Sequence, residues 1–200
     1  YIGGLGVVVF LLLVMPQASP YRLKLTNMEM STLSKGGYKY KSSKIVRIIT
    51  GVYVGFTIAC ALSLWAAGMS LFDAVNHSFS IAATGGFSTR NMSIGYYQSD
   101  LINLIVIFFM AVCAMHFGLI YAVFATGSLK PMKNSVVGYY FGSITVCSLI
   151  VMFVLMIQGG YDSWGRAAVD SAFTVVSYMS TAGFGICDNS TWPWFAGLVL

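Results

Sequence analysis

Two short segments of this chain share one pattern of threonine, glycine and phenylalanine. Thr84-Gly85-Gly86-Phe87-Ser88 returns 97 residues later as Thr181-Ala182-Gly183-Phe184-Gly185. Backbone carbonyl oxygens can replace the water around a cation when they ring it closely. Pointing successive carbonyls the same way needs positive φ angles, which glycine adopts at little steric cost. The repeated turn therefore predicts a cation site made of backbone oxygens.

Comparison of the two turns separates the required positions from the tolerant ones. Gly86 and Gly183 hold the same place, whereas Gly85 is replaced by Ala182. Each threonine can add a hydroxyl, and we expect each phenylalanine to wedge its turn against neighbouring helices. The candidate site therefore comprises Thr84, Gly85, Gly86, Thr181, Ala182 and Gly183, supported by Phe87 and Phe184.

Each turn follows a short apolar segment, at about 71–83 and 167–179, that we predict to be helical. At 1.5 Å per residue such a helix reaches about 20 Å, short of the roughly 30 Å hydrocarbon core of a bilayer. The helix dipole is negative at the turn, which favours a cation there. For one copy alone, an ordinary glycine cap is an equal alternative. Two copies in register favour the ion site.

An aspartate precedes each threonine by 11 residues, and these acids, Asp73 and Asp170, are candidates for the outer mouth of a pore. For Asp73 the alternative is a capping box with Ser70. We expect Asp170 in the first helical turn, where a carboxylate suits the dipole. Asp73 and His77 share a helix face, which would suit a proton relay. The second copy has Thr174 in place of the histidine, which argues against that relay.

The composition is that of a membrane protein. The chain is 58% hydrophobic and 8% charged, whereas soluble domains carry about 25% charged residues. Both ends lie within apolar runs, so we expect a piece of a longer protein. The cysteines show no metal spacing, and most of them lie in apolar runs, where cysteine packs as a small hydrophobe. The candidate membrane spans are the runs 2–15, 45–67, 101–125 and 136–157.

The charges predict the topology. Nine of the 11 basic residues fall before residue 48 or just after residue 125, and short basic connections face the cytoplasm. Both lie on that side only if the segment 71–87 enters and leaves from the outer face. This distribution, rather than nucleic-acid binding, explains the net charge of +5. The short helices are then re-entrant, and their turns must be buried in protein or line a water-filled cavity.

We therefore predict an all-α integral membrane protein of repeated helix–pore-loop–helix units, with re-entrant half-helices around a pseudo-four-fold pore. The membrane lipid surrounds it. The predicted parts are the end of repeat one (1–16), a basic cytoplasmic loop (17–44), repeat two (45–125), a second cytoplasmic loop (126–135) and most of repeat three (136–200).

The pore-loop segments carry a family resemblance. Residues 73–89, followed by Ser93-Ile94-Gly95-Tyr96, resemble the second pore loop of the TrkH/KtrB potassium uptake family. Residues 180–184 resemble its third pore loop, and Gly3-Gly4-Leu5-Gly6 resembles the end of its first repeat. The resemblance implies four repeats around a potassium path in a bacterial inner membrane. It places K+ at the carbonyls of Thr84, Gly85, Thr181 and Ala182.

The resemblance also implies a homodimer and a cytoplasmic nucleotide-binding regulatory partner, with no enzymatic activity and no covalent cofactor. In plant relatives, serine at a filter-glycine position goes with sodium permeation. The glycines at positions 86 and 183 therefore favour potassium. His116 stands where some members have asparagine, and it has no assigned role.

Three rival interpretations stay open. The chain could belong to a sodium-conducting or sodium-coupled member of the same superfamily. It could be an intramembrane enzyme using Asp73 and His77, or a structural membrane subunit. Because two of four filter segments cannot close a ring, we expect the 200 residues alone not to conduct.

Overall fold

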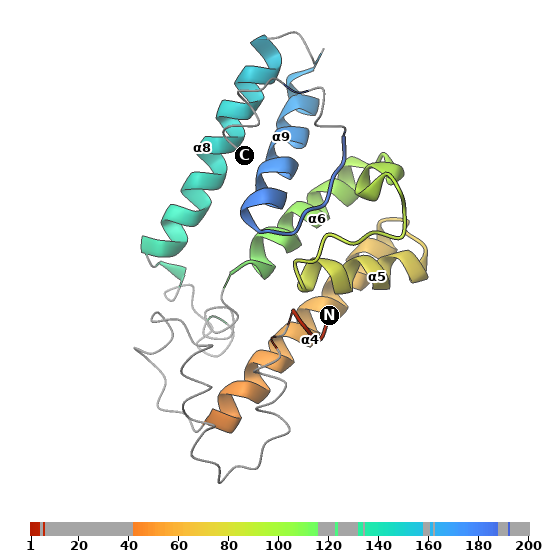
Figure 1. Ribbon diagram of the computed structural model, residues 1–200, viewed down its shortest axis with the longest axis vertical. Helices are drawn as coiled ribbons and strands as arrows, with labels where there is room; N and C mark the ends of the chain where they lie inside the picture. Colours follow the sequence, from red (N-terminus) through yellow and green to blue (C-terminus); the bar gives the residue numbers. More distant parts are fainter. Residues whose placement is uncertain are drawn as a thin grey trace.

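The computed structural model describes residues 1–4, 6, 42–115, 123, 132–133, 135–157, 161, 163–187 and 192. Over these ranges the chain forms helices and loops without a strand, so the all-α prediction is confirmed (Figure 1). The elements are α4 (Ser42–Ala66), α5 (Leu71–Ala82), the short 3-10 helix η1 (Ser93–Tyr97), α6 (Asp100–Cys113), α8 (Ser135–Ile157) and α9 (Trp164–Met179).

Each of the two long helices is followed by a short one. Within α4 the stretch Ile49–Ala66, and the whole of α8, are long and apolar enough to cross a membrane. α5 has 12 residues and α9 has 16, which corresponds to about 18 and 24 Å. Neither of the short helices reaches the roughly 30 Å of a hydrocarbon core. A long helix followed by a short one is thus found twice.

Helix α9 begins earlier than the sequence analysis predicts. It starts at Trp164 rather than near residue 167, with Ser163 as its N-cap residue. The Trp164 ring packs edge-on against Phe153 of α8, with ring centroids 5.8 Å apart, and this contact extends the helix by about a turn. Asp170 therefore lies in the second turn, and the expectation that it lies in the first is wrong.

Helix α6 starts close to the expected position and has a shorter described part. It begins at Asp100 and ends at Cys113, whereas the apolar run continues to residue 125. The N–H of Met115 donates to the carbonyl of Val112 at 3.0 Å, a tighter bond that closes the last turn. Residues 116–122, including His116, lie outside the described residues, as do most residues of both predicted cytoplasmic loops.

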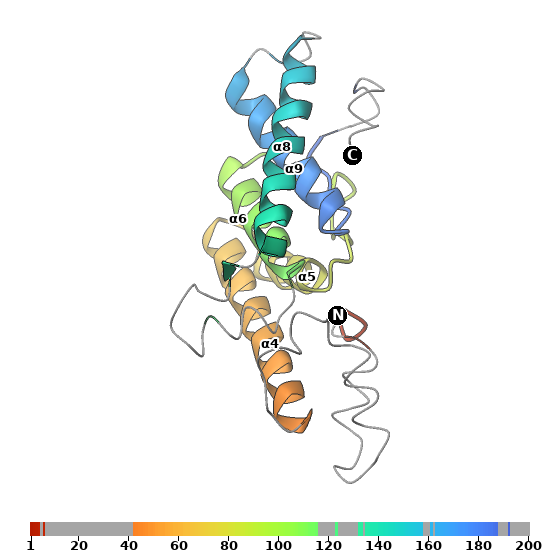
Figure 2. The same cartoon turned by 90° about the vertical axis from the view of Figure 1, so that its left-hand side faces the viewer.

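The helices pack in two pairs around α6. α5 lies along α4, α9 lies along α8, and α6 contacts α4, α5 and α9 (Figures 1 and 2). One buried core joins both pairs, with Leu64 of α4, Ile81 of α5, Val106 of α6 and Phe173 of α9 all fully buried. The two units therefore share a core, and α5 and α9 are held on either side of α6.

The outer surfaces of α4 and α8 are apolar. Large exposed side chains on these helices include Ile58, Leu62 and Trp65 on α4, and Leu149 and Phe153 on α8. Exposed apolar faces of this extent suit lipid rather than water. As expected for small hydrophobes, Cys60 and Cys113 are buried free thiols.

Candidate functional site

The C-terminal end of α5 forms a defined backbone motif. The N–H of Thr84 donates to the carbonyl of Ile81 at 3.0 Å, and the N–H of Gly85 donates to the carbonyl of Ser80 at 2.8 Å. This nested pair of bonds is the Schellman motif, which ends many helices. It turns the N–H groups of the first two turn residues back toward the helix.

Helix α9 ends in the same way. The N–H of Thr181 donates to the carbonyl of Tyr178 at 3.0 Å, and that of Ala182 to the carbonyl of Ser177 at 2.9 Å. Each of these residues lies 97 positions after its counterpart at the end of α5. The two copies therefore agree in hydrogen bonding as well as in sequence.

The residue that caps each helix in the left-handed region is a threonine. The φ angles are +50° at Thr84 and +57° at Thr181, and the glycines two positions later have +70° at Gly86 and +77° at Gly183. A β-branched residue with positive φ is an outlier and costs about 1–2 kcal/mol. The glycine-cap alternative is therefore wrong in detail, because the threonine occupies the place that glycine takes in an ordinary cap.

The two turns share a backbone conformation that bears on their carbonyl oxygens. The residue between threonine and glycine, Gly85 or Ala182, does not have positive φ. In both turns, therefore, the sign of φ runs positive, negative, positive over the three residues. Both follow the negative end of a helix dipole. Within the described parts of the chain, no hydrogen bond ends on the carbonyls of Thr84, Gly85, Thr181 and Ala182.

The two turns lie against each other. A Cβ atom on Gly86 would overlap the carbonyl oxygen of Ala182. A Cβ on Gly183 would lie 4.0 Å from the Cα of Gly86, an ordinary contact. At position 86, both the positive φ angle and the lack of room for a Cβ require glycine. At position 183, only the positive φ angle favours it. Of the six candidate residues of the repeated turn, this contact brings together Gly86 of the first copy with Ala182 and Gly183 of the second.

The two phenylalanines have different surroundings. Phe184 is 4% exposed, and its carbonyl accepts a bond of 2.7 Å from the Ser177 hydroxyl. Phe87 is 82% exposed, and the buried hydroxyl of Ser80, the counterpart of Ser177, has no partner among the described residues. The expectation that Phe87 wedges against neighbouring helices is therefore wrong for this part of the chain, since no described helix covers the ring.

A hollow of about 470 Å³ lies beside α5 and explains the exposure of Phe87. Its lining includes Phe87, Ser80 and Gly85 from the turn region, together with Tyr1 and Gly4 from the start of the chain. The Tyr1 ring also packs on Phe79 of α5, with centroids 4.6 Å apart. The start of the chain therefore lies next to the first of the two turns.

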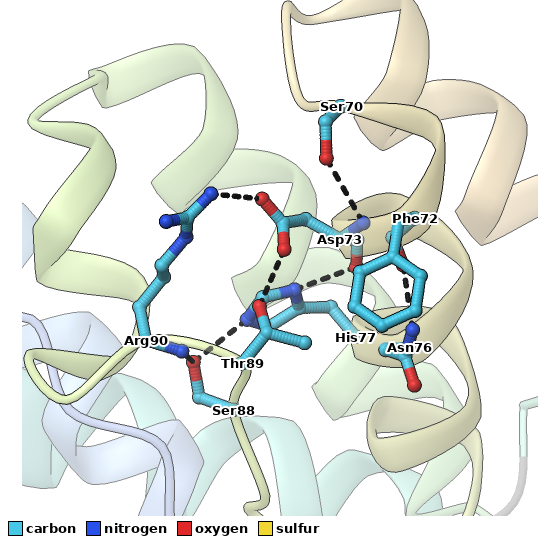
Figure 3. A network of polar contacts seen from close by, with 8 residues as sticks. All are labelled: Ser70, Phe72, Asp73, Asn76, His77, Ser88, Thr89 and Arg90. Carbon is cyan, nitrogen blue, oxygen red and sulfur yellow. Dashed lines mark hydrogen bonds and ion pairs between the residues drawn. The ribbon is translucent and has the colours of Figure 1, made fainter.

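Asp73 joins the start of α5 to the segment after the turn (Figure 3). Its N–H donates to the Ser70 hydroxyl at 3.1 Å, so Ser70 is the N-cap residue. Its carboxylate accepts from Thr89 Oγ1 at 2.6 Å and from Arg90 at 2.8 Å, contacts that the capping-box alternative does not include. The Thr89 hydroxyl, joined by Arg90, holds the pKa of this carboxyl below its usual range, although burial acts in the opposite direction. Asp73 is 3% exposed and paired, which leaves no free carboxylate for an outer mouth.

His77 is fully buried and bonded at both ring nitrogens (Figure 3). Nδ1 lies 2.7 Å from the carbonyl oxygen of Asp73, and Nε2 lies 2.9 Å from the Ser88 hydroxyl. Because a carbonyl can only accept, Nδ1 carries the proton. The imidazole thus bonds the backbone of Asp73 rather than its carboxylate, and a direct proton relay between the two side chains has no support in these contacts.

Asp170 is anchored differently from Asp73. Its carboxylate accepts from the Tyr161 hydroxyl at 2.8 Å and lies 3.9 Å from Arg166 Nε. Thr174 Oγ1 donates to the Asp170 carbonyl at 2.8 Å, as His77 donates to the Asp73 carbonyl. The first copy therefore ties its acid to the segment after the turn, and the second ties it to residues at and before the start of its helix.

The segments after the two turns also contact each other. The N–H of Gly95 donates to the carbonyl of Gly185 at 3.2 Å, and the N–H of Gly185 donates to the Ser93 hydroxyl at 3.3 Å. A Cβ on Gly95 would overlap the carbonyl oxygen of Ile186. The sequence singles out Ser93 and Gly95 only through the family resemblance and does not predict this pairing.

Apolar helices of membrane length, joined to two short helices whose C-terminal turns lie against each other, are typical of an integral membrane protein. A family model described as "Cation transport protein" (TrkH) matches residues 1–156. The chain belongs to the TrkH family of cation transport proteins. The predicted family, the bacterial inner membrane location and the absence of enzymatic function are confirmed by this membership.

Several relatives match along the whole chain. It is 32% identical to the Trk system potassium uptake protein TrkH of Escherichia coli strain K12, covering 100% of this chain and 42% of that protein. Identity to TrkH of Vibrio parahaemolyticus is 33%, with the same shares covered. The crystal structure of the potassium transporter TrkH from Vibrio parahaemolyticus matches with a TM-score of 0.81 and 32% identity, over 98% of this chain and 40% of that one. The chain thus spans about two fifths of the length of these relatives.

Proposed function

We propose that this chain forms part of a pore for potassium uptake, with K+ bound by the carbonyls of Thr84, Gly85, Thr181 and Ala182. The observation that carries the proposal is the shared alternation of backbone conformation in two turns that touch at Gly86. Relatives at 32–33% identity are named potassium uptake proteins, which supports K+ as the ion.

In the proposed mechanism the ion loses water at the turns and the carbonyl oxygens replace it. The N–H groups of the first two residues of each turn are bonded back to α5 and α9, so at these positions acceptors rather than donors are available to the ion. The negative ends of both helix dipoles add to the attraction of a cation and repel anions. The ion then moves down its electrochemical gradient.

The proposal extends beyond these 200 residues. It places α5 and α9 as re-entrant half-helices of repeats two and three around a pseudo-four-fold pore, with the other two turns supplied by the rest of the protein. It includes a homodimer and a cytoplasmic nucleotide-binding regulatory partner. These assembly features are supported by the family resemblance.

The test replaces the glycine at the contact between the turns. In the full-length protein, Gly86→Ser should lower the preference for K+ over Na+ uptake by about tenfold, because left-handed strain of about 1–2 kcal/mol adds to an overlap with Ala182. Gly68→Ala is the matched control, since Gly68 has φ +103° and open space around it. It should keep the preference.

Two results would contradict the proposal. Equal uptake of Na+ and K+ by the unmodified protein would favour the sodium alternative. Loss of all function in His77→Ala, with Gly86→Ser unaffected, would favour the enzyme alternative that uses Asp73 and His77. Radioactive or dye-reported ion uptake into proteoliposomes separates these results.

A further inference from the structure

We propose that Ser93 and Gly95 are positioning residues that set the separation of the two turns and thereby the ion preference. The inference rests on the proposed function, because it assigns these residues to the same ion path. They lie on or beside η1, outside the repeated turn itself, and they act on the second turn through Gly185.

Both backbone groups of Gly185 are bonded by this segment. Its carbonyl accepts from the N–H of Gly95 at 3.2 Å, and its N–H donates to the Ser93 hydroxyl at 3.3 Å. We call this reciprocal pair the Ser93–Gly185 clip. Since Gly185 is two residues after Gly183, a shift of Gly185 moves the second turn with it.

The clip is itself anchored to the first copy. The N–H of Ser93 donates to the carbonyl of Arg90 at 2.9 Å, and Arg90 is paired with Asp73 at the start of α5. Ile94, between the two clip residues, is fully buried in the common core. The segment is therefore fixed on both sides, and it can transmit the position of α5 to the second turn.

The local geometry suits these two residue types. Ser93 has φ +54°, a left-handed conformation that directs its hydroxyl to Gly185 at a steric cost. Gly95 approaches the Ile186 carbonyl so closely that no Cβ fits. Ser93 bonds Gly185, and Gly95 bonds Gly185 and lies against Ile186. A strained serine and a glycine without side-chain space, on the same segment of the other copy, favour a shared role in holding that copy.

Selectivity is the property that should respond. The preference of a carbonyl site depends on its size and on how firmly its dipoles are held. The direct contact at Gly86 limits how closely the two turns approach, and the clip limits how far the second turn moves away. Loss of the clip should therefore weaken discrimination between cations more than it weakens uptake.

The test uses two variants of the full-length protein in proteoliposomes. Ser93→Gly removes the hydroxyl acceptor and suits the left-handed φ angle, so it should not strain the backbone. Gly95→Ala introduces a Cβ against the Ile186 carbonyl. Each should lower the ratio of K+ to Na+ uptake by about two- to tenfold, the range expected for loss of one ordinary hydrogen bond. Gly165→Ala, whose Cβ would meet only the Ser163 hydroxyl at 3.7 Å, should leave the ratio unchanged.

A second measurement does not depend on transport. Ser93→Gly should speed hydrogen exchange of the Gly185 amide in the folded full-length protein, because the N–H of Gly185 donates to the Ser93 hydroxyl. Gly165→Ala should leave that rate unchanged. An unchanged rate in Ser93→Gly would overturn the clip.

The outcomes separate the inference from the proposed function. If both variants keep the wild-type ion ratio while Gly86→Ser lowers it, the positioning role is overturned and the proposed function stands. If the unmodified protein shows no preference for K+, the proposed selectivity fails and so does the role assigned to the clip. A lower ratio in both variants, with faster exchange of the Gly185 amide in Ser93→Gly, supports the clip.

Discussion

At the scale of single residues, Ser80 and Ser177 occupy equivalent positions in the two copies and differ in hydrogen bonding. Ser177 donates to the carbonyl of Phe184, whereas the Ser80 hydroxyl is buried without a partner in the described structure. The local sequences are close copies, so the difference comes from what surrounds each turn. Phe184 is enclosed by the core, and Phe87 faces a hollow.

This difference predicts unequal effects of one substitution. Ser177→Ala should lower the free energy of unfolding by about 1–3 kcal/mol, because it leaves the buried Phe184 carbonyl unsatisfied. Ser80→Ala should change it by less than about 0.5 kcal/mol, as expected where no bond is lost. Thermal unfolding of the purified full-length variants in detergent measures both. Equal destabilisation would show that Ser80 has a bonded partner in the complete protein.

The residue types predicted the backbone conformation of the two glycines and not that of the two threonines. Gly86 and Gly183 follow from the need for positive φ, and both have it. Propensity argues against a β-branched residue in the left-handed region, so the conformation of Thr84 and Thr181 could not be predicted from the sequence. It is imposed by the Schellman bonds, which are made by neighbours and not by the threonine side chain.

At the scale of elements, α5 and α9 share a C-terminal motif and differ in how their N-terminal halves are anchored. The equal spacing of Asp73 and Asp170 from their turns suggested a common role. Asp73 is bonded to Thr89 and Arg90, after its turn, and Asp170 to Tyr161 and Arg166 instead. Partners so distant along the chain are set by tertiary packing, which a single sequence pattern does not contain.

Hydrogen exchange should distinguish the two anchors. Asp73→Asn removes the charge that holds Arg90, so amides in residues 88–97 should exchange faster. Asp170→Asn should instead affect residues 161–166. Faster exchange in the same segment for both variants would contradict the separate anchors.

The bonds of the Asp73 carboxylate to Thr89 and Arg90 should also persist in mild acid. Its pKa in the folded protein lies below the unfolded value, which is about 4. The stabilisation is therefore complete above the unfolded pKa and is lost only as the pH falls through the lower, folded pKa. Exchange in residues 88–97, corrected for intrinsic rates, should be the same at pH 7 and pH 5. A marked increase at pH 5 would be inconsistent with this pairing.

At the scale of the whole molecule, the long and short helices were predicted from apolar runs and charge distribution, and the bounds of α4, α5 and α8 agree with the prediction to within three residues. The shared core around α6 and the contact between the turns could not be predicted in this way. Periodicity describes one helix at a time, whereas the contact of Gly86 with Ala182 depends on how two helix pairs pack.

The hollow beside α5 borders the first turn, with Gly85 and Phe87 in its lining. Under the proposed function, the 200 residues alone should give no K+ flux above that of empty liposomes, while the full-length protein conducts. A reconstituted flux assay with a potassium-sensitive dye tests this. Measurable K+ flux from the 200-residue chain would show that four turns are not needed.

The spacing of the two copies bears on how they have diverged. The starts of α5 and α9 are 93 residues apart, whereas every equivalent pair from the acid to the glycine is 97 apart. The second copy therefore has four more residues in its half-helix, and all of them precede the acid. From the acid to the glycine the two copies differ in side chains, with a histidine opposite a threonine and a glycine opposite an alanine, and they agree in length to the residue.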